Sequence, residues 1–146
     1  MFSIVIIKPD AYNKKEEILK YFIGYDIEIL ADPVMLTKTI AKEFYSIHKD
    51  KPFYNILIDF MISGPVLILK IIGDDNVIKN VRHIIQNQIR PKYAVDATAN
   101  AIHASDSFQS AKKEYDIIKK YILDRYVLEN SVDTLLTNLI QELKTI

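Results

Sequence analysis

Cysteine is absent from this chain of 146 residues, and glycine is scarce. Without a thiol, the protein forms no disulfide, has no thiol nucleophile and binds no metal through cysteine. Its three glycines, Gly24, Gly64 and Gly73, lie too far apart to form a glycine-rich phosphate loop or a dinucleotide fingerprint. Any phosphate that the protein binds must therefore be held by side chains and helix ends.

An excess of charge of one sign is also missing, because 19 Lys and Arg residues balance 19 Asp and Glu residues. Proteins that bind nucleic acids more often show a clear basic excess, so we expect no specific nucleic-acid partner. A neutral chain can still gather its lysines and arginines in one cleft, which is compatible with a small phosphate ligand.

Long apolar runs are missing as well. A membrane-spanning helix needs about 20 apolar residues, and the apolar run over residues 66–72 is interrupted by Lys70. Residues 1–8 show neither the basic leading region nor the small-residue cleavage site of a signal peptide. We therefore expect a cytoplasmic protein with no membrane partner.

What the sequence does contain is enough apolar residues, 49% of the total, for one hydrophobic core. Strand-like segments alternate with segments of helical period, which predicts an α/β or α+β sandwich. We expect strands at 2–7, 25–36, 66–72 and 101–103, and helices at 14–23, from 39, at 52–60, at 74–85 and from about 105 to 122. The chain is predicted to be one domain over residues 1–146, with 119–146 as a helical C-terminal extension.

The C-terminal extension has an apolar stripe of helical spacing. Its members, at i, i+3, i+4 and i+7, are Val132, Leu135, Leu136, Leu139, Ile140 and Leu143. Such a stripe predicts an amphipathic helix with one apolar face. Two interpretations are open: the face packs on its own domain, which we favour, or it docks on a partner.

Three histidines are present, and one of them stands out. His48 and His83 fall in predicted helices and are expected at the surface or its boundary. His103 ends a short apolar strand and precedes a polar helix start. Taken alone, a histidine in this position is more often structural than catalytic.

The residues around His103 change that interpretation. Residues 100–107, Asn-Ala-Ile-His-Ala-Ser-Asp-Ser, resemble the active-site signature of nucleoside diphosphate kinases. Residues 8–11, 48–53 and 63–65 resemble three further motifs of this family, in the family's order. The resemblance covers residues 1 to about 118. It implies a ferredoxin-like α/β (α+β) sandwich with a four-stranded antiparallel sheet, whose helices we expect on one face.

The resemblance also implies an activity, the transfer of the γ-phosphate of a nucleoside triphosphate to a nucleoside diphosphate by a ping-pong mechanism. His103 matches the phosphorylated nucleophile, Glu114 the acid that holds the other ring nitrogen, and Ser105 a residue that assists that acid. A neutral imidazole can attack phosphorus directly, and a carboxylate fixes its tautomer.

Seven side chains match the family's nucleotide contacts. Lys8, Tyr45, Arg82, Arg90 and Asn100 match positions that contact phosphates and sugar, and Phe53 and Leu57 match positions at the base. Guanidinium groups suit phosphate oxygens, and a phenylalanine stacks on any base without reading its edge. Mg²⁺ is expected to be held mainly by the nucleotide's phosphates. Each residue alone has a structural interpretation, as a core aromatic or a surface charge; their joint match favours the functional one.

The sequence departs from the family between the two arginines, which are only eight positions apart. Most members have a long loop there, with a threonine that contacts phosphate; Asn87 or Gln88 is a candidate replacement. That loop supports assembly around a threefold axis, so we expect a homo-oligomer, with a dimer favoured over a hexamer. Three further differences are Ala99, Ala104 and Pro91-Lys92.

We expect a weakened but working enzyme, since the nucleophile and its acid are intact. One alternative is a nucleotide-binding module without catalysis, suggested by the lost loop. Another is an interaction protein that uses its C-terminal helix as the contact surface.

Overall fold

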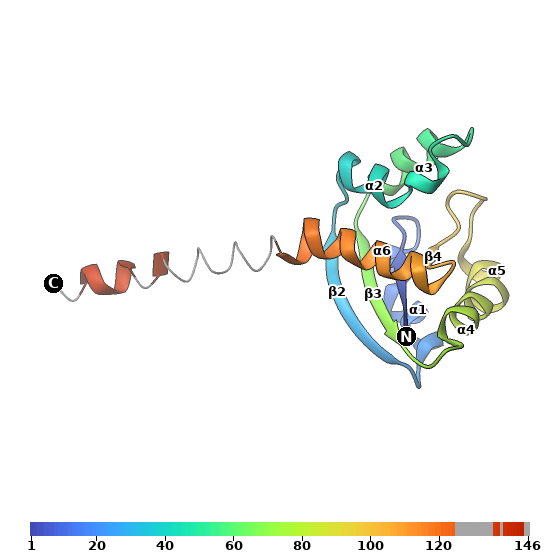
Figure 1. The fold of residues 1–146 in the computed structure, drawn as a ribbon, viewed down its shortest axis with the longest axis horizontal. Helices are drawn as coiled ribbons and strands as arrows, with labels where there is room; N and C mark the ends of the chain where they lie inside the picture. The colour runs from blue at the N-terminus through green and yellow to red at the C-terminus, as the bar shows by residue number, and fades with distance from the viewer. Residues whose placement is uncertain (125–135, 138, 145–146) are drawn as a thin grey trace.

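The computed structural model describes residues 1–124, 136–137 and 139–144. Its sheet has four strands in the order β2-β3-β1-β4, and every neighbouring pair is antiparallel. The strands are β1 (Phe2–Ile7), β2 (Asp26–Val34), β3 (Val66–Ile72) and β4 (Ile102–Ala104). This arrangement confirms the predicted α+β sandwich with a four-stranded antiparallel sheet (Figure 1).

Five helices lie close to the predicted segments but differ in their ends, and α5 was not predicted. They are α1 (Lys15–Leu19), α2 (Lys38–Phe44), α3 (Tyr54–Met61), α4 (Val77–Ile84), α5 (Arg90–Tyr93) and α6 (Phe108–Ile118). The single helix expected at 14–23 is split, because 3₁₀ turns at Tyr12–Lys14 and Lys20–Phe22 flank α1; a third 3₁₀ turn, Ser46–His48, follows α2. Ser107 begins α6, since its hydroxyl accepts the backbone N–H of Ser110 at 3.0 Å.

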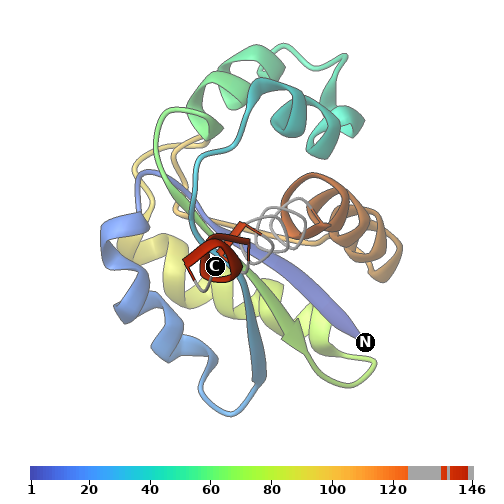
Figure 2. The same cartoon turned by 90° about the vertical axis from the view of Figure 1, so that its left-hand side faces the viewer.

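The helices cover both faces of the sheet, so the expectation of one covered face is wrong (Figure 2). Val5 and Ile7 of β1 pack in a core with α1 and α4, whereas Ile4 and Ile6 pack in a second core with α2, α3 and α6. The physical reason is visible in the strands. A sheet with one wet face alternates apolar and polar residues, but β1 and β3 are apolar almost throughout, as in sheets buried on both sides.

The short strand β4 places the residues of the predicted site. It pairs with β1, with His103 opposite Ile6 and Ile102 opposite Ile7. The backbone N–H of Lys8, directly after β1, donates to the carbonyl of Ala101 at 2.9 Å. The ends of two strands that are far apart in sequence therefore meet at one edge of the sheet.

The described residues of the C-terminal stripe are exposed, contrary to the favoured interpretation that this face packs on its own domain. Leu136, Leu139, Ile140 and Leu143 lie in helical segments and are 53–70% exposed. Figure 1 shows the described C-terminal segments, 136–137 and 139–144, standing away from the sheet. Val132 and Leu135 fall outside the described residues. Within the described part of the chain, no helix has the length and apolarity required to cross a membrane.

Two adjacent side chains at the end of the first helical segment differ in burial, so their substitution tests the packing of the core. Phe22 is fully buried, whereas Ile23 is 80% exposed. We expect Phe22→Ala to lower the free energy of unfolding by about 3–5 kcal/mol, because it leaves a cavity. Ile23→Ala, the matched control, should change it by less than about 0.5 kcal/mol. Urea denaturation measures both, and equal effects would contradict the assigned packing.

Candidate active site

His103 lies on β4 at the wall of a cavity of about 440 Å³. Its side chain is 16% exposed. The rings of Phe44 and Tyr45 flank the imidazole edge-on, with centroids at 5.1 and 5.8 Å. The ring is thus held between aromatic neighbours while it still reaches the open space of the cavity.

One nitrogen of His103 is already engaged. Nε2 lies 3.1 Å from Oε2 of Glu114, on α6. The hydroxyl of Ser105 donates to Oε1 of the same carboxylate at 2.6 Å, and the backbone N–H of Ile4 donates to that hydroxyl oxygen at 2.9 Å. A carboxylate can only accept, so the hydrogen belongs on Nε2. Nδ1 then keeps its lone pair and is the nitrogen free for chemistry.

The structure brings the predicted nucleotide contacts together in one place. The side chains that line the cavity with His103 include Lys8, Tyr45, Phe53, Leu57, Arg82, Arg90 and Asn100. Glu114 and Ser105 lie behind the histidine and are buried. A cavity of this size is in the range that takes a small-molecule ligand.

Lys8 stands at the floor of the cavity and is almost fully buried. Its Nζ donates to Oδ1 of Asn100 at 2.7 Å and lies 3.4 Å from the carbonyl of Thr98. Burial, and then the nearby charge of Arg90, lower the pKa of Lys8 to about 8, although Asp10 opposes the shift. The ammonium is therefore held where a further negative charge would stabilise it.

The two arginines face the cavity from one continuous helical segment. A π-helical turn, Ile85–Ile89, joins α4 to α5, so no loop separates Arg82 from Arg90. Arg82 pairs with Asp106, and Nη2 of Arg90 donates to the carbonyl of Ile102 at 3.1 Å. Burial and the charge of Arg82 lower the pKa of Arg90.

The proposed substitutes for the missing loop threonine lie elsewhere. The side-chain amide of Asn87 donates to the carbonyl of His83 at 2.9 Å, one turn back on the same helix. Neither Asn87 nor Gln88 lines the cavity. His83 is exposed, as expected.

The aromatic side chains form the mouth of the cavity. Phe53 is 44% exposed there, and the ring of His48 tilts against it at 5.5 Å. The hydroxyl of Tyr45 is buried and has no hydrogen-bond partner among the described residues. Burial, and then the charge of Glu114, raise the pKa of Tyr45, so this hydroxyl stays protonated and can donate to a ligand.

Three residues near the cavity had no assigned role. Asp106 pairs with Arg82, His48 supports Phe53, and Oδ2 of Asp10 accepts the backbone N–H of Ala101 at 3.1 Å. Ala101 has φ 77°, a left-handed conformation that costs energy for alanine. Asp10 therefore helps to hold the strained backbone two residues before His103. All three lie inside the motifs at 8–11, 48–53 and 100–107, which is the signal that could have found them.

No group of three or more histidine, aspartate or glutamate side chains that could hold a metal ion occurs among residues 1–124 and the described C-terminal residues. The site is thus a basic cavity with one carboxylate-backed imidazole at its wall. A cavity of this kind has the charge that suits phosphate groups, and its imidazole has a nitrogen that is chemically able to act as a nucleophile.

The chain matches the family model of nucleoside diphosphate kinase over residues 2–121. It is 38% identical to the nucleoside diphosphate kinase of Campylobacter concisus, over 77% of this chain and 90% of that protein. The crystal structure of the Aquifex aeolicus enzyme is similar, with a TM-score of 0.74 and 38% identity over 80% of this chain and 93% of the other. The Halobacterium salinarum enzyme in complex with CDP is also similar, with a TM-score of 0.71 and 26% identity over 80% and 86%.

This chain therefore belongs to the nucleoside diphosphate kinase family.

The buried ammonium of Lys8 makes stability depend on pH. Its pKa falls from 10.5 to about 8 on folding. Between these values the unfolded chain holds a proton that the folded chain has lost, so a rise in pH favours the folded state. We expect wild type to gain up to about 3 kcal/mol relative to Lys8→Met between pH 7.5 and 10.5.

Urea denaturation of wild type, Lys8→Met and the exposed-site control Lys79→Met across that range measures the effect. A stability difference between wild type and Lys8→Met that stays constant with pH, or follows that of the control, would contradict the assigned burial.

Proposed function

We propose that this protein transfers the γ-phosphate of a nucleoside triphosphate to a nucleoside diphosphate in two steps through His103. The observation that carries the proposal is the free Nδ1 of His103 in a cavity lined by Lys8, Arg82, Arg90 and Asn100. Nδ1 attacks the γ-phosphorus, the bond to the bridging oxygen breaks, and the nucleoside diphosphate leaves. A second diphosphate then takes the phosphoryl group by the reverse reaction.

Glu114 and Ser105 act on the ring from behind. As Nδ1 bonds to phosphorus, positive charge develops on the imidazole, and the carboxylate 3.1 Å from Nε2 stabilises it. Ser105 fixes the second carboxylate oxygen and is itself fixed by the backbone of Ile4. This chain of hydrogen bonds orients the nucleophile before any substrate enters.

The cations neutralise the phosphates, because phosphoryl transfer depends mainly on positioning and charge. Burial and then the charge of Arg90 lower the pKa of Lys8, and burial and then the charge of Arg82 lower the pKa of Arg90, so a phosphate among these cations relieves their repulsion. Arg82 is held by Asp106 and can exchange that carboxylate for a phosphate oxygen.

The remaining contacts suit the sugar and base. Asn100 and Tyr45 present hydrogen-bonding groups in the cavity, and Phe53 and Leu57 offer apolar surface at its mouth. A stacked ring grips any base through its face, which supports broad base tolerance. The similar Halobacterium salinarum enzyme binds CDP in its crystal structure, which supports a nucleoside diphosphate as ligand of this cavity.

We propose Mg²⁺ as the metal of the reaction; it would be held mainly by the phosphates of the bound nucleotide and would help to neutralise their charge. Among the described residues, no group of three or more acidic or histidine side chains could hold a metal ion. An ion that is held mainly by the nucleotide does not require such a group. We also propose a homo-oligomer, a dimer rather than a hexamer, because a helical turn replaces the loop between the arginines. The nucleotide substrates support a cytoplasmic location.

The alternative is a module that binds nucleotides without transferring phosphate. The helical turn at Ile85–Ile89 favours it, since it removes one phosphate contact of the family. Binding with no exchange of label between nucleotides would decide for this alternative.

The phosphohistidine itself is the direct test. Incubation of the protein with γ-labelled ATP and Mg²⁺ should leave acid-labile label on wild type and on His83→Ala, an exposed-site control. His103→Ala should carry none, because the attacking nitrogen is gone. Label that persists on His103→Ala, or folded wild type that stays unlabelled, would overturn the proposal.

Glu114→Gln tests the role of the carboxylate. The amide keeps the shape but not the charge, and loss of a charged hydrogen bond typically costs about 1.5–3 kcal/mol. We expect kcat to fall roughly ten- to a hundredfold with little change in KM, because Glu114 does not line the cavity. Asp116→Asn, at an exposed site on the same helix, is the control. An effect on KM alone would instead assign Glu114 to substrate binding.

A further inference from the structure

Ala101 forms a sharp turn between two parts of the candidate active site. Its φ is 77°, in the left-handed region, and the N–H of Ile102 donates to the carbonyl of Asn100 at 3.0 Å. A hydrogen bond from residue i+2 to residue i, around a residue with positive φ, defines the rare and strained form of the γ-turn. The turn joins Asn100 to strand β4, which carries His103.

The backbone of Ala101 is held on both sides by the segment that follows β1. Its carbonyl accepts the N–H of Lys8 at 2.9 Å, and its N–H donates to Oδ2 of Asp10 at 3.1 Å. Ala101 is fully buried, so the loss of this acceptor would leave a buried N–H unsatisfied, which is costly. Asp10 therefore supplies the bond that the N–H side of the turn requires.

The two sides of the turn differ in how firmly they are anchored. The downstream side is held independently of Asp10, because β4 pairs with β1. A change of φ at Ala101 would therefore move Asn100 rather than His103. Oδ1 of Asn100 accepts from Nζ of Lys8 at 2.7 Å, and both side chains line the cavity. The turn thus sets where this ammonium and this amide stand relative to the imidazole.

We propose that Asp10 is a positioning residue of this site: it holds the left-handed turn at Ala101 and so keeps Lys8 and Asn100 in place for a nucleotide. The inference rests on the proposed function, which assigns nucleotide contacts to these two side chains. Asp10 itself does not line the cavity, so it acts through the turn and does not touch the ligand.

A second route from Asp10 to the ligand is its charge, since Asp10 opposes the lowering of the pKa of Lys8. Two variants separate the routes. Asp10→Asn keeps an oxygen that can accept the N–H of Ala101 but removes the charge, whereas Asp10→Ala removes both. If the turn is what matters, Asp10→Asn should be clearly less damaging than Asp10→Ala.

The variant Ala101→Gly tests the turn itself, because glycine adopts a positive φ without the steric cost that alanine has. Asp10 is then no longer needed to hold a strained residue. The double variant Asp10→Ala/Ala101→Gly should therefore lose less than the single variant Asp10→Ala. Effects that simply add would show that Asp10 does not act through this turn.

The readout is the dissociation constant of ADP with Mg²⁺, measured by isothermal titration calorimetry, because it requires no phosphoryl transfer. We expect Asp10→Ala to raise this constant roughly tenfold or more, since small misplacements of binding groups are expensive. Asp10→Asn and Asp10→Ala/Ala101→Gly should each raise it less. Urea denaturation shows which proteins are folded, and Asp10→Ser, which is too short to reach the turn, replaces Asp10→Ala if the latter does not fold.

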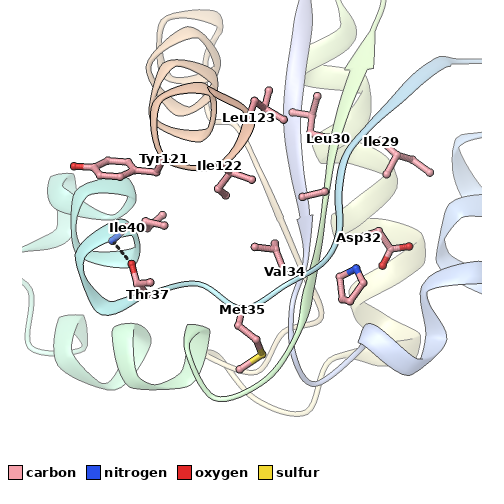
Figure 3. A pocket seen from close by; sticks show the side chains of 12 residues that line it. Ile29, Leu30, Asp32, Val34, Met35, Thr37, Ile40, Tyr121, Ile122 and Leu123 are labelled. Atoms are coloured by element: carbon pink, nitrogen blue, oxygen red, sulfur yellow. Dashed lines mark hydrogen bonds between the residues drawn. The ribbon is translucent and has the colours of Figure 1, made fainter. Parts of the chain in front are cut away.

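Two controls remove a bond of the same kind elsewhere. Oδ1 of Asp74 accepts the N–H of Asn76 at 2.9 Å, and Oγ1 of Thr37 accepts the N–H of Ile40 at 3.2 Å in the groove beside β2 (Figure 3). Neither Asp74 nor Thr37 lines the active-site cavity. Asp74→Ala and Thr37→Ala should therefore leave the dissociation constant of ADP within roughly twofold of wild type.

Three results would each overturn the inference: unchanged ADP affinity in Asp10→Ala, an equal loss in Asp10→Asn, or a loss that Ala101→Gly does not reduce. The proposed transfer fails in a different way. Wild type that binds ADP but carries no label in the phosphohistidine assay defeats the transfer, while the ADP affinities still decide the role of Asp10.

Discussion

The short pairing between β1 and β4 is the interaction on which the site depends. It sets His103 opposite Ile6, and it brings Ser105 onto the backbone of Ile4, where the serine hydroxyl is fixed before it reaches Glu114. The geometry of His103 is therefore anchored in strand β1, which is buried on both faces. The three-residue strand β4 pairs with one of the most deeply buried elements of the fold.

The cavity collects positive charge in a molecule whose net charge is zero. Lys8 is nearly buried, and burial and then the charge of Arg90 lower its pKa; burial and then the charge of Arg82 lower the pKa of Arg90. Without a ligand the charged forms of both side chains are therefore disfavoured. An anion offsets that cost when it enters. The unfavourable electrostatics of the empty cavity therefore favour the binding of an anion. The carboxylates of Asp10 and Asp106 reduce the destabilisation of the protein without a ligand.

Much of the fold could be predicted because β1 and β3 are short, apolar and bounded by turn residues. The same two strands also indicate that both faces of the sheet are covered, because neither strand alternates apolar and polar residues. The expectation of one covered face came from the ferredoxin-like resemblance instead. The site residues were predictable from the motifs rather than from their chemistry. No periodicity brings Lys8 next to Asn100, 92 positions away; only the register of β1 and β4 does so. The pairing of Arg82 with Asp106 and the helical join between the arginines required coordinates, because the sequence shows only a shortened spacing.

The helical join has a consequence for how long a nucleotide stays. The residues Ile85–Ile89 continue the helix instead of forming a loop and do not line the cavity, so they do not cover a bound nucleotide. Phe53 at the mouth of the cavity is 44% exposed. A bound nucleotide is then held mainly through its phosphates. In a two-step reaction with one cavity, the first nucleotide must leave before the second can bind. Weak contacts to the base and sugar favour this rapid exchange, and the time that a nucleotide stays bound becomes sensitive to ionic strength.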